Sequence, residues 1–275
     1  MPDLQMRFHN DMLVLSGNLR TSLASYGHGD DDSIEMLDIL EEEAVEQALR
    51  IQMSAGAQCL CTPTLDITRA RLAHGRMRDK QQEVIDVALS LCNEQRPQHV
   101  IAEIGPTMLP LDPASKSTLV ANRDQYAEAV EAFGPDSVDA FLFNGLEGAE
   151  DVRCALMGAR KVCATPVMVS VDVSHQGVLM CRTQPIEEII DVAIELQADV
   201  IGIRTDADPT QLEALVRRMA STCDLPILVQ VAVTEPTKRY PIKPEENPYW
   251  HPDTMLELVD RLRPAGAQFL RAVGQ

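Results

Sequence analysis

Aromatic and basic residues are both scarce in this sequence. Phe, Trp and Tyr make up 4% of the 275 residues, whereas apolar residues of all kinds make up 45%, so the core has to be built from aliphatic side chains. Lys and Arg number 24 against 42 Asp and Glu, which gives a formal net charge of −18. Binding to nucleic acid or to an anionic membrane needs clustered positive charge. We therefore expect neither among the partners.

Signals for export, membrane insertion and metal-binding cysteine pairs are also missing. The opening segment MPDLQMRFHND lacks the apolar core of a signal peptide, and no apolar run reaches the ~18 residues that a membrane span requires. The seven cysteines include no CxxC pair. We expect free thiols and a reducing, cytoplasmic location.

One segment, GHGDDDSIEMLDILEEEAVE (27–46), concentrates acidic residues and contains no Lys or Arg. Acidic residues near a helix N-terminus are favoured by the helix dipole, so we interpret this segment as a solvated helix face. A docking surface for a basic partner is the alternative.

Eight short apolar runs recur along the chain, and helix-like stretches separate them. The runs are nearly continuous rather than alternating, as strands buried on both faces are. They cover residues 12–16, 57–62, 99–105, 138–144, 166–173, 198–204, 226–233 and 267–273. This alternation predicts a single-domain (β/α)8 TIM barrel over residues 1–275. An open doubly wound sheet also alternates, but the even spacing and the lack of a GxGxxG turn favour closure.

The last run ends close to Gln275, which leaves no sequence for an eighth outer helix. Without that helix, the apolar flanks of the first and eighth strands would be exposed. We expect the natural chain to continue further. The alternative is that the N-terminal segment or a partner covers these apolar flanks. A homo-oligomer also stays open.

The segments after several predicted strands are long and polar, whereas those before strands are short. The long segments are 16–36, 105–122, 173–185 and 234–252. Barrels of this type carry their sites at the carboxyl ends of the strands, so we expect the functional site there. The proline-rich loop 236–251 is predicted to be either a lid over this mouth or a semi-rigid surface loop.

Several motifs, taken in order, resemble those of one family. They are LVLSGNLRTSL (13–23), SAGAQCLCTPTLDITRARL (54–72), IAEIGPT (101–107), DAFLFNGLEGAEDVRCAL (139–156), VIGIRT (200–205) and AGAQFLRAVG (265–274). Their ordered spacing is similar to that of the homocysteine S-methyltransferase family, which includes the homocysteine barrel of cobalamin-dependent methionine synthase and betaine–homocysteine methyltransferase. The resemblance implies a (β/α)8 barrel and methyl transfer related to methionine biosynthesis, beside a folate or corrinoid carrier.

The same resemblance implies a zinc ion held by three cysteines, one at the end of the sixth strand and two at the end of the eighth. Zinc binds the homocysteine thiol and lowers its pKa, so a thiolate can attack a methyl group. In this chain Thr205 stands at the first position, and Val273 and Gly274 stand at the paired positions. These residues cannot supply thiolates, so we predict no zinc and no other resident cofactor.

Further family positions are changed. Ser16 replaces an Asp in the first motif, Pro63 replaces an Asn in the second, and Asn144-Gly145 replaces a Glu-Thr pair after the fourth strand. We interpret these changes as loss of the ancestral homocysteine chemistry.

Other groups of possible metal ligands are weak. Cys59 and Cys61 alternate on one strand and point to the same side, which indicates buried core thiols. Asp172, His175 and Cys181 follow the fifth strand without an identifiable fourth ligand. We predict no metal site from either group.

Polar residues at the predicted strand ends ring the barrel mouth. We predict Glu103 and Asp172 as catalytic acid–base residues, because apolar walls raise a carboxyl pKa. The predicted substrate-binding residues are Arg20, Thr62, Asn144, Arg204, Thr205, Gln230 and Arg271.

The two arginines at the ends of the sixth and eighth strands need partners, since an unpaired buried charge is costly. One interpretation is a structural network in which Arg204 and Arg271 pair with nearby carboxylates. The other is a clamp that binds a carboxylate or phosphate by bidentate hydrogen bonds. Both hold if the ligand displaces a carboxylate.

These observations predict an enzyme, a divergent methyltransferase without the zinc site that acts on or binds a small anionic substrate. The methyl donor would be a folate or a corrinoid supplied by a carrier domain or protein. The alternative is a non-catalytic barrel that binds a small anion or a partner protein. A zinc-dependent homocysteine methyltransferase would need ligands beyond Gln275, because no Cys follows Cys223.

Overall fold

The structure is a computed structural model that describes residues 3–24, 27, 33–134, 136–180, 183–233, 249 and 252–274. Eight parallel strands follow one another in the order β1-β8-β7-β6-β5-β4-β3-β2. They are β1 (Leu13–Val14), β2 (Cys59–Cys61), β3 (His99–Ile104), β4 (Ala140–Leu146), β5 (Val167–Asp172), β6 (Val200–Thr205), β7 (Ile227–Val233) and β8 (Ala267–Gly274). Each strand lies in one of the eight apolar runs or extends it by a residue or two.

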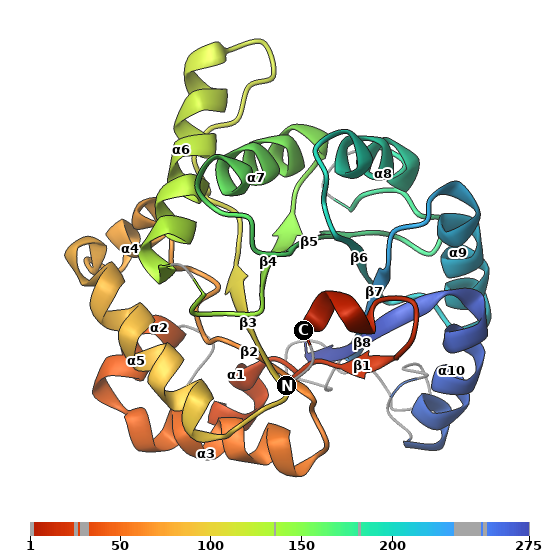
Figure 1. Cartoon of the computed structure of the whole chain (residues 1–275), viewed down its shortest axis with the longest axis horizontal. Coiled ribbons are helices and arrows are strands. Elements are labelled where there is room, and N and C mark those ends of the chain that lie inside the picture. Colours follow the sequence, from red (N-terminus) through yellow and green to blue (C-terminus); the bar gives the residue numbers. More distant parts are fainter. Residues whose placement is uncertain are drawn as a thin grey trace.

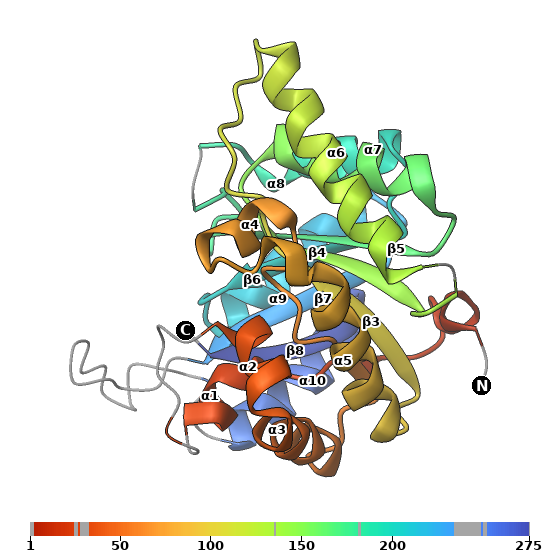
Figure 2. The ribbon, with the colours of Figure 1, turned by 90° about the vertical axis from the view of Figure 1, so that its left-hand side faces the viewer.

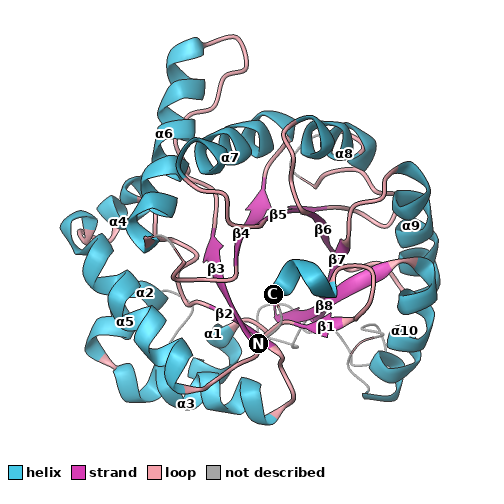
Figure 3. Ribbon diagram, in the orientation of Figure 1, coloured by secondary structure: helices cyan, strands magenta, loops and turns pink. Residues whose placement is uncertain are grey.

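A bridge between Leu15 and Cys59 closes the ring between β1 and β2, where the Ser16 amide donates to the Cys59 carbonyl at 2.8 Å. Figure 1 looks down the barrel, with the strands at the centre and helices around them. Figure 3 shows the same view with the strands in magenta. The predicted (β/α)8 barrel is confirmed.

Helices fill the connections between successive strands, and one 3₁₀ turn, η1 (Leu4–Arg7), precedes β1. They are α1 (Leu19–Ala24), α2 (Ile34–Leu40), α3 (Glu42–Ser54), α4 (Arg69–His74), α5 (Gln81–Glu94), α6 (Lys116–Phe133), α7 (Ala149–Val162), α8 (Ile186–Glu195), α9 (Pro209–Thr222), α10 (Pro252–Ala265) and two 3₁₀ turns, η1 (Leu4–Arg7) and η2 (Arg78–Lys80). Local signals explain their starts: Asp208 caps α9 in a reciprocal capping box, with Pro209 at its first position. In α8, Ile186, Ile189, Ile190 and Ala193 form a buried apolar stripe, whereas Ile194 is 49% exposed.

An apolar plug closes the amino-terminal end of the barrel interior. Inward-facing strand residues such as Ile101, Leu142, Met168 and Phe269 form one buried cluster with Leu4 of η1. Phe8 packs edge-on against Phe269 with ring centroids 5.9 Å apart. Figure 2 shows η1 at one end of the barrel and the end of β8 at the other. A ligand therefore reaches the interior from the carboxyl-terminal mouth.

The acidic segment is only partly the solvated helix face that the sequence indicated. Glu41, which separates α2 from α3, and Glu42 and Glu43, in the first turn of α3, are exposed. Glu35 and Asp38, by contrast, are 2% and 0% exposed. The solvated-face interpretation is wrong for these two side chains, because α2 turns them towards the barrel and leaves Leu40 outside. Residues 28–32 lie outside the described part of the chain.

The outer face of β1 and of the end of β8 is partly exposed in the described part of the chain: Val14 is 39% exposed, whereas Leu270 is 4% exposed. A groove of about 340 Å³ runs along it, and Val14, Ala55, Val233 and Ala272 line the groove. The N-terminal segment does not cover this face, because η1 packs at the amino-terminal end of the barrel instead. Continuation of the chain remains a prediction.

Two further expectations concern the periphery. The proposed lid, residues 236–251, lies outside the described residues except for Tyr249. No helix in the described ranges has both the length and the hydropathy to cross a membrane.

Candidate functional site

A small cavity of about 80 Å³ opens at the carboxyl-terminal mouth of the barrel. It lies between the loops after β1 and β2 and the ends of β3, β4, β6 and β8. Predicted site residues that line it are Thr62, Glu103, Asn144, Arg204 and Arg271. For comparison, an engineered cavity of about 150 Å³ accommodates a benzene molecule, so this one admits only a few non-hydrogen atoms.

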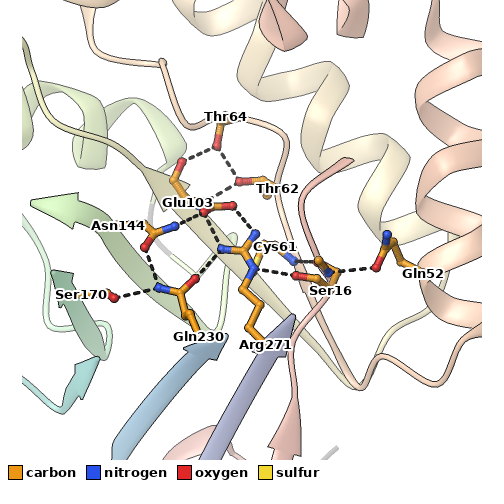
Figure 4. Close-up of polar contacts among 11 residues, drawn as sticks. Ser16, Gln52, Cys61, Thr62, Thr64, Glu103, Asn144, Ser170, Gln230 and Arg271 are labelled. Carbon is orange, nitrogen blue, oxygen red and sulfur yellow. Dashed lines mark hydrogen bonds and ion pairs between the residues drawn. The ribbon is translucent and has the colours of Figure 1, made fainter. Parts of the chain in front are cut away.

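Arg271 and Glu103 form the floor of the cavity. Arg271 reaches from β8 across to β3, where two of its guanidinium nitrogens bind the two Glu103 oxygens at 2.6 and 2.8 Å. Its Nε donates to the Ser16 carbonyl of the strand-one segment at 2.7 Å. Figure 4 shows this two-pronged contact. Arg271 is 3% exposed, so the pair is a buried, charge-assisted link across the barrel.

Two amide side chains extend the floor from Glu103 to the far strands. The Asn144 amide donates to Glu103 Oε1 at 2.6 Å, and the Gln230 amide donates to Asn144 Oδ1 and to Ser170 Oγ, both at 2.7 Å. Arg271 also donates to Gln230 Oε1 at 3.3 Å. Five strand positions and Ser16, which follows β1, thus share one network whose hydrogen-bonding groups are largely used within the protein (Figure 4).

A β-bulge aims Asn144 into this network. The register of β4 against β5 shifts between Asn144 and Leu146, and Gly145 takes a φ of +78°, which a glycine adopts without strain. Bulges of this kind re-aim side chains beside sites. The Asn-Gly sequence is therefore a local cause of the amide's position.

The Thr62 hydroxyl is hydrogen-bonded within the cavity wall and is not free to bind a ligand. Its Oγ1 lies 2.6 Å from Thr64 Oγ1, Thr64 donates to the Glu103 carbonyl at 2.8 Å, and the Glu103 amide donates back to Thr62 Oγ1 at 3.1 Å. Nearby, burial raises the pKa of the Cys61 thiol to about 11. Cys61 is therefore a neutral thiol near neutral pH.

A second ion pair lies higher in the mouth. Arg204 and Asp172 face each other in the β5–β6 register, and one guanidinium nitrogen of Arg204 binds Asp172 Oδ2. The Arg204 side chain is 41% exposed, and Asp172 Oδ1 has no hydrogen-bond partner among the described residues. Unlike Arg271, Arg204 therefore has guanidinium nitrogens that make no described hydrogen bond.

The remaining predicted residues are not part of this network. Thr205 is buried, and its Oγ1 accepts a hydrogen bond from the Ala207 amide at 3.2 Å, so it shapes the turn after β6. The Arg20 side chain lies outside the described part of the chain. Sequence reasoning missed Ser16, Thr64 and Ser170, which complete the network, and Glu35, which lines the cavity from α2.

The residues at the implied zinc positions do not fit that metal. The Thr205 hydroxyl is engaged by Ala207, and Val273 offers only an apolar side chain. Among the described residues, no group of three His, Cys, Asp or Glu side chains is arranged to hold a metal ion. Cys59 and Cys61 belong to the buried core of the barrel, as the sequence indicated, whereas Cys181 lies outside the description.

Comparison with known proteins decides the family. The family model described as Homocysteine S-methyltransferase matches residues 13–271. The chain belongs to this family. Methionine synthase of Mycobacterium tuberculosis is 23% identical to this homocysteine S-methyltransferase-family chain over 231 residues, which is 77% of this chain and 19% of that protein. The chain thus spans about a fifth of that relative.

Two solved structures have a fold similar to that of this chain. The homocysteine methyltransferase MmuM of Escherichia coli in its metallated form aligns with a TM-score of 0.77 at 15% identity, covering 100% of this chain and 96% of that chain. The carboxyl transferase domain of Rhizobium etli pyruvate carboxylase aligns with a TM-score of 0.55 at 11% identity, covering 98% and 40%. At these identities the likeness shows the barrel fold alone.

Proposed function

We propose that this chain takes part in methyl transfer to a small anionic acceptor without a zinc thiolate, with a folate or corrinoid methyl donor carried by another domain or protein. Family membership supports methyl transfer as the class of reaction. The donor set at Thr205 and Val273 supports a departure from zinc-bound thiol chemistry. The proposal keeps the link to methionine-related metabolism and a cytoplasmic location.

The state of Arg204 carries the proposal. Arg204 lines the cavity, its side chain is 41% exposed, and its described ion pair occupies one guanidinium nitrogen. A guanidinium presents donors in a fixed fork that matches a carboxylate or phosphate. In a chain of net charge −18, such a group offers an anion a local positive site.

Arg271 has a different part in the proposal. The Glu103 carboxylate already occupies its fork, and Ser16 and Gln230 take two further hydrogen bonds. A ligand carboxylate at Arg271 would have to displace Glu103 and leave that acid buried without its cation. We therefore assign the ligand to Arg204, and we assign Arg271 and Glu103 to the structure of the floor. Asp172, beside Arg204, is the acid–base candidate.

A non-catalytic barrel that binds a small anion or a partner protein is the second candidate. The saturated network of the floor favours it, because Glu103 is bound by Arg271 and Asn144 and has little capacity left for proton transfer. The two candidates share the anion site at Arg204 and differ in whether a methyl group moves.

A ligand screen with metal analysis tests the proposal. The purified protein is expected to contain no stoichiometric zinc and to be stabilised in a thermal-shift screen by small carboxylates, with folates, corrinoids and homocysteine screened in parallel. The stabilisation should disappear in Arg204→Ala and persist in Arg217→Ala, a matched control that removes a surface arginine paired with Glu213. One zinc per chain, or full stabilisation in Arg204→Ala, would sink the proposal. Transfer of a labelled methyl group from a folate or corrinoid donor to the stabilising ligand separates the enzyme from the binding barrel.

A further inference from the structure

The mouth cavity has a second ionisable wall on the side away from Arg204. Glu35 of α2 and Asp66 of the loop after β2 line it. In the strand order of the ring, β2 and β6 lie on opposite sides, so these acids and Arg204 approach the cavity from different directions.

Glu35 is buried with few partners. It is 2% exposed, its Oε1 accepts the Asp66 amide hydrogen at 2.7 Å, and its Oε2 lies 2.9 Å from Ser33 Oγ. No Lys or Arg side chain in the described ranges forms an ion pair with it. A carboxylate withdrawn from water without a counter-ion is costly, and such a group takes up a proton instead.

Two further acids lie near Glu35, and the cations of the cavity are paired with other carboxylates. Asp38, one turn along α2, is fully buried and has no hydrogen-bond partner among the described residues. Asp66 faces Glu35 from the loop after β2 and is paired with Arg71 of α4. The cations that share the cavity each have a carboxylate partner as well: Arg271 has Glu103, and Arg204 has Asp172. Burial raises the pKa of Glu35, and the charge of Asp66 raises it further.

We infer that Glu35 is held as a neutral carboxylic acid in the cavity wall and donates a hydrogen bond to the anionic group that Arg204 binds. The Asp66 amide has to donate to Oε1, so the proton of the neutral acid lies on Oε2. The Ser33 hydroxyl, which donates to Oε2 in the structure, then turns to accept from it. When an anion enters, this O–H turns from Ser33 to the ligand. The ligand contact rests on the proposed function, whereas the neutral state of Glu35 does not.

This arrangement defines the class of ligand. A neutral donor on one wall and a guanidinium on the other suit a compact oxyanion, such as a carboxylate, in a cavity that admits only a few atoms. An ionised Glu35 would instead repel that anion. Binding should therefore weaken as the pH rises through the titration of Glu35.

The protonation state is measured without any ligand. In protein labelled with [δ-¹³C]glutamate, Glu35→Gln removes one resonance and so assigns it. We expect that resonance to titrate with a midpoint above the value of about 4.3 for an unperturbed glutamate. A midpoint at or below that value overturns the inference, whatever the ligand screen finds.

The ligand contact is measured with acetate as the probe, at pH values where acetate itself is ionised. The thermal stabilisation that acetate gives the wild-type protein should fall as the pH passes the Glu35 midpoint. In Glu35→Gln it should persist over the same range, because the carboxamide is a neutral donor of similar shape.

Asp38→Asn is the matched control, since Asp38 does not line the cavity, and it should keep the fall seen in the wild type. The same fall in Glu35→Gln overturns the contact. If acetate stabilises the wild type at no pH, the ligand contact and the proposed anion site both fail, and the carbon titration alone then decides the neutral state.

Discussion

Two arginine–carboxylate pairs lie at the carboxyl-terminal end of this barrel, one buried and one partly exposed, and they differ in nearly every physical respect. Arg271 and Glu103, at the floor, are buried, doubly hydrogen-bonded to each other and surrounded by further partners. Arg204 and Asp172, nearer the mouth, are partly exposed and meet through one guanidinium nitrogen. Buried pairs are strongly destabilising when one partner is removed, whereas exposed pairs contribute little to stability. We therefore expect the Arg271–Glu103 pair, the lower pair, to stabilise the fold, and the Arg204–Asp172 pair, the upper pair, to bind the ligand proposed above.

The largest effect is expected from breaking the lower pair. Arg271→Met leaves Glu103 buried without its cation, which typically costs about 3–5 kcal/mol of the free energy of unfolding. Denaturant unfolding followed by circular dichroism measures the loss. The double change Glu103→Leu with Arg271→Met should recover part of it, because no charge is then left unpaired. A loss below about 1 kcal/mol in the single variant would show that the lower pair is not a structural link.

A buried acid with no cation at all sharpens the comparison. Asp38→Leu removes a carboxyl group that has no hydrogen-bond partner among the described residues, so we expect the free energy of unfolding to rise by roughly 1–3 kcal/mol. Burial raises the pKa of Asp38 well above its usual range in the folded protein. The folded state therefore binds its proton more tightly than the unfolded chain.

The raised pKa of Asp38 makes the free energy of unfolding depend on pH. The free energy of unfolding should fall as the pH rises from the unfolded value of 3.8 towards the raised folded pKa of Asp38. Equilibrium unfolding of the wild type and Asp38→Asn across this range measures the slope, which should be smaller in the variant. Equal slopes would mean that Asp38 ionises in the folded state as it does in the unfolded chain.

An intermediate effect is expected from Asn144, which links the floor to the far strands. Asn144→Ala removes a hydrogen bond to Glu103 and one from Gln230, and each buried group left unsatisfied costs about 1–3 kcal/mol. Denaturant unfolding curves of the wild type and the variant measure the loss in the free energy of unfolding. Ser117→Ala, on the exposed side of the α6 start, is a control that should change stability little. Equal stability of the two variants would contradict a connected floor.

The smallest effect on stability is expected from breaking the upper pair. Arg204→Ala should change the free energy of unfolding by about 1 kcal/mol or less, as for other partly exposed ion pairs. Thermal and denaturant unfolding of the wild type and variant measure the change. A loss comparable to that of Arg271→Met would place both pairs in the fold and remove the distinction between them.

The sequence predicted the barrel well because its signals are local and repeated. Eight apolar runs mark strands buried on both faces, and the alternation with helices allows few topologies. It also placed Glu103, Asn144, Gln230 and Arg271 at the strand ends, where they meet. Which arginine takes which carboxylate depends on how far each strand extends into the ring, and sequence spacing carries no signal for that.

Glu35 and Asp38 show where local reasoning fails. Both lie in an acidic segment, and the acids of such a segment are expected to face water. In the structure they are buried on the same face as Leu37, while Leu40 of the same helix is exposed, which departs from an amphipathic pattern. The packing of α2 against α5 and the loop after β2 sets this orientation, so only the tertiary structure reveals it.

The division of labour between the two pairs is tested most directly by a binding isotherm for acetate. Calorimetric titration of the wild type, Arg204→Ala and the double variant Glu103→Leu with Arg271→Met compares them under one set of conditions. The account predicts that binding is lost in Arg204→Ala and retained in the double variant, provided that the double variant is folded by circular dichroism. Retention in Arg204→Ala together with loss in the folded double variant would contradict it.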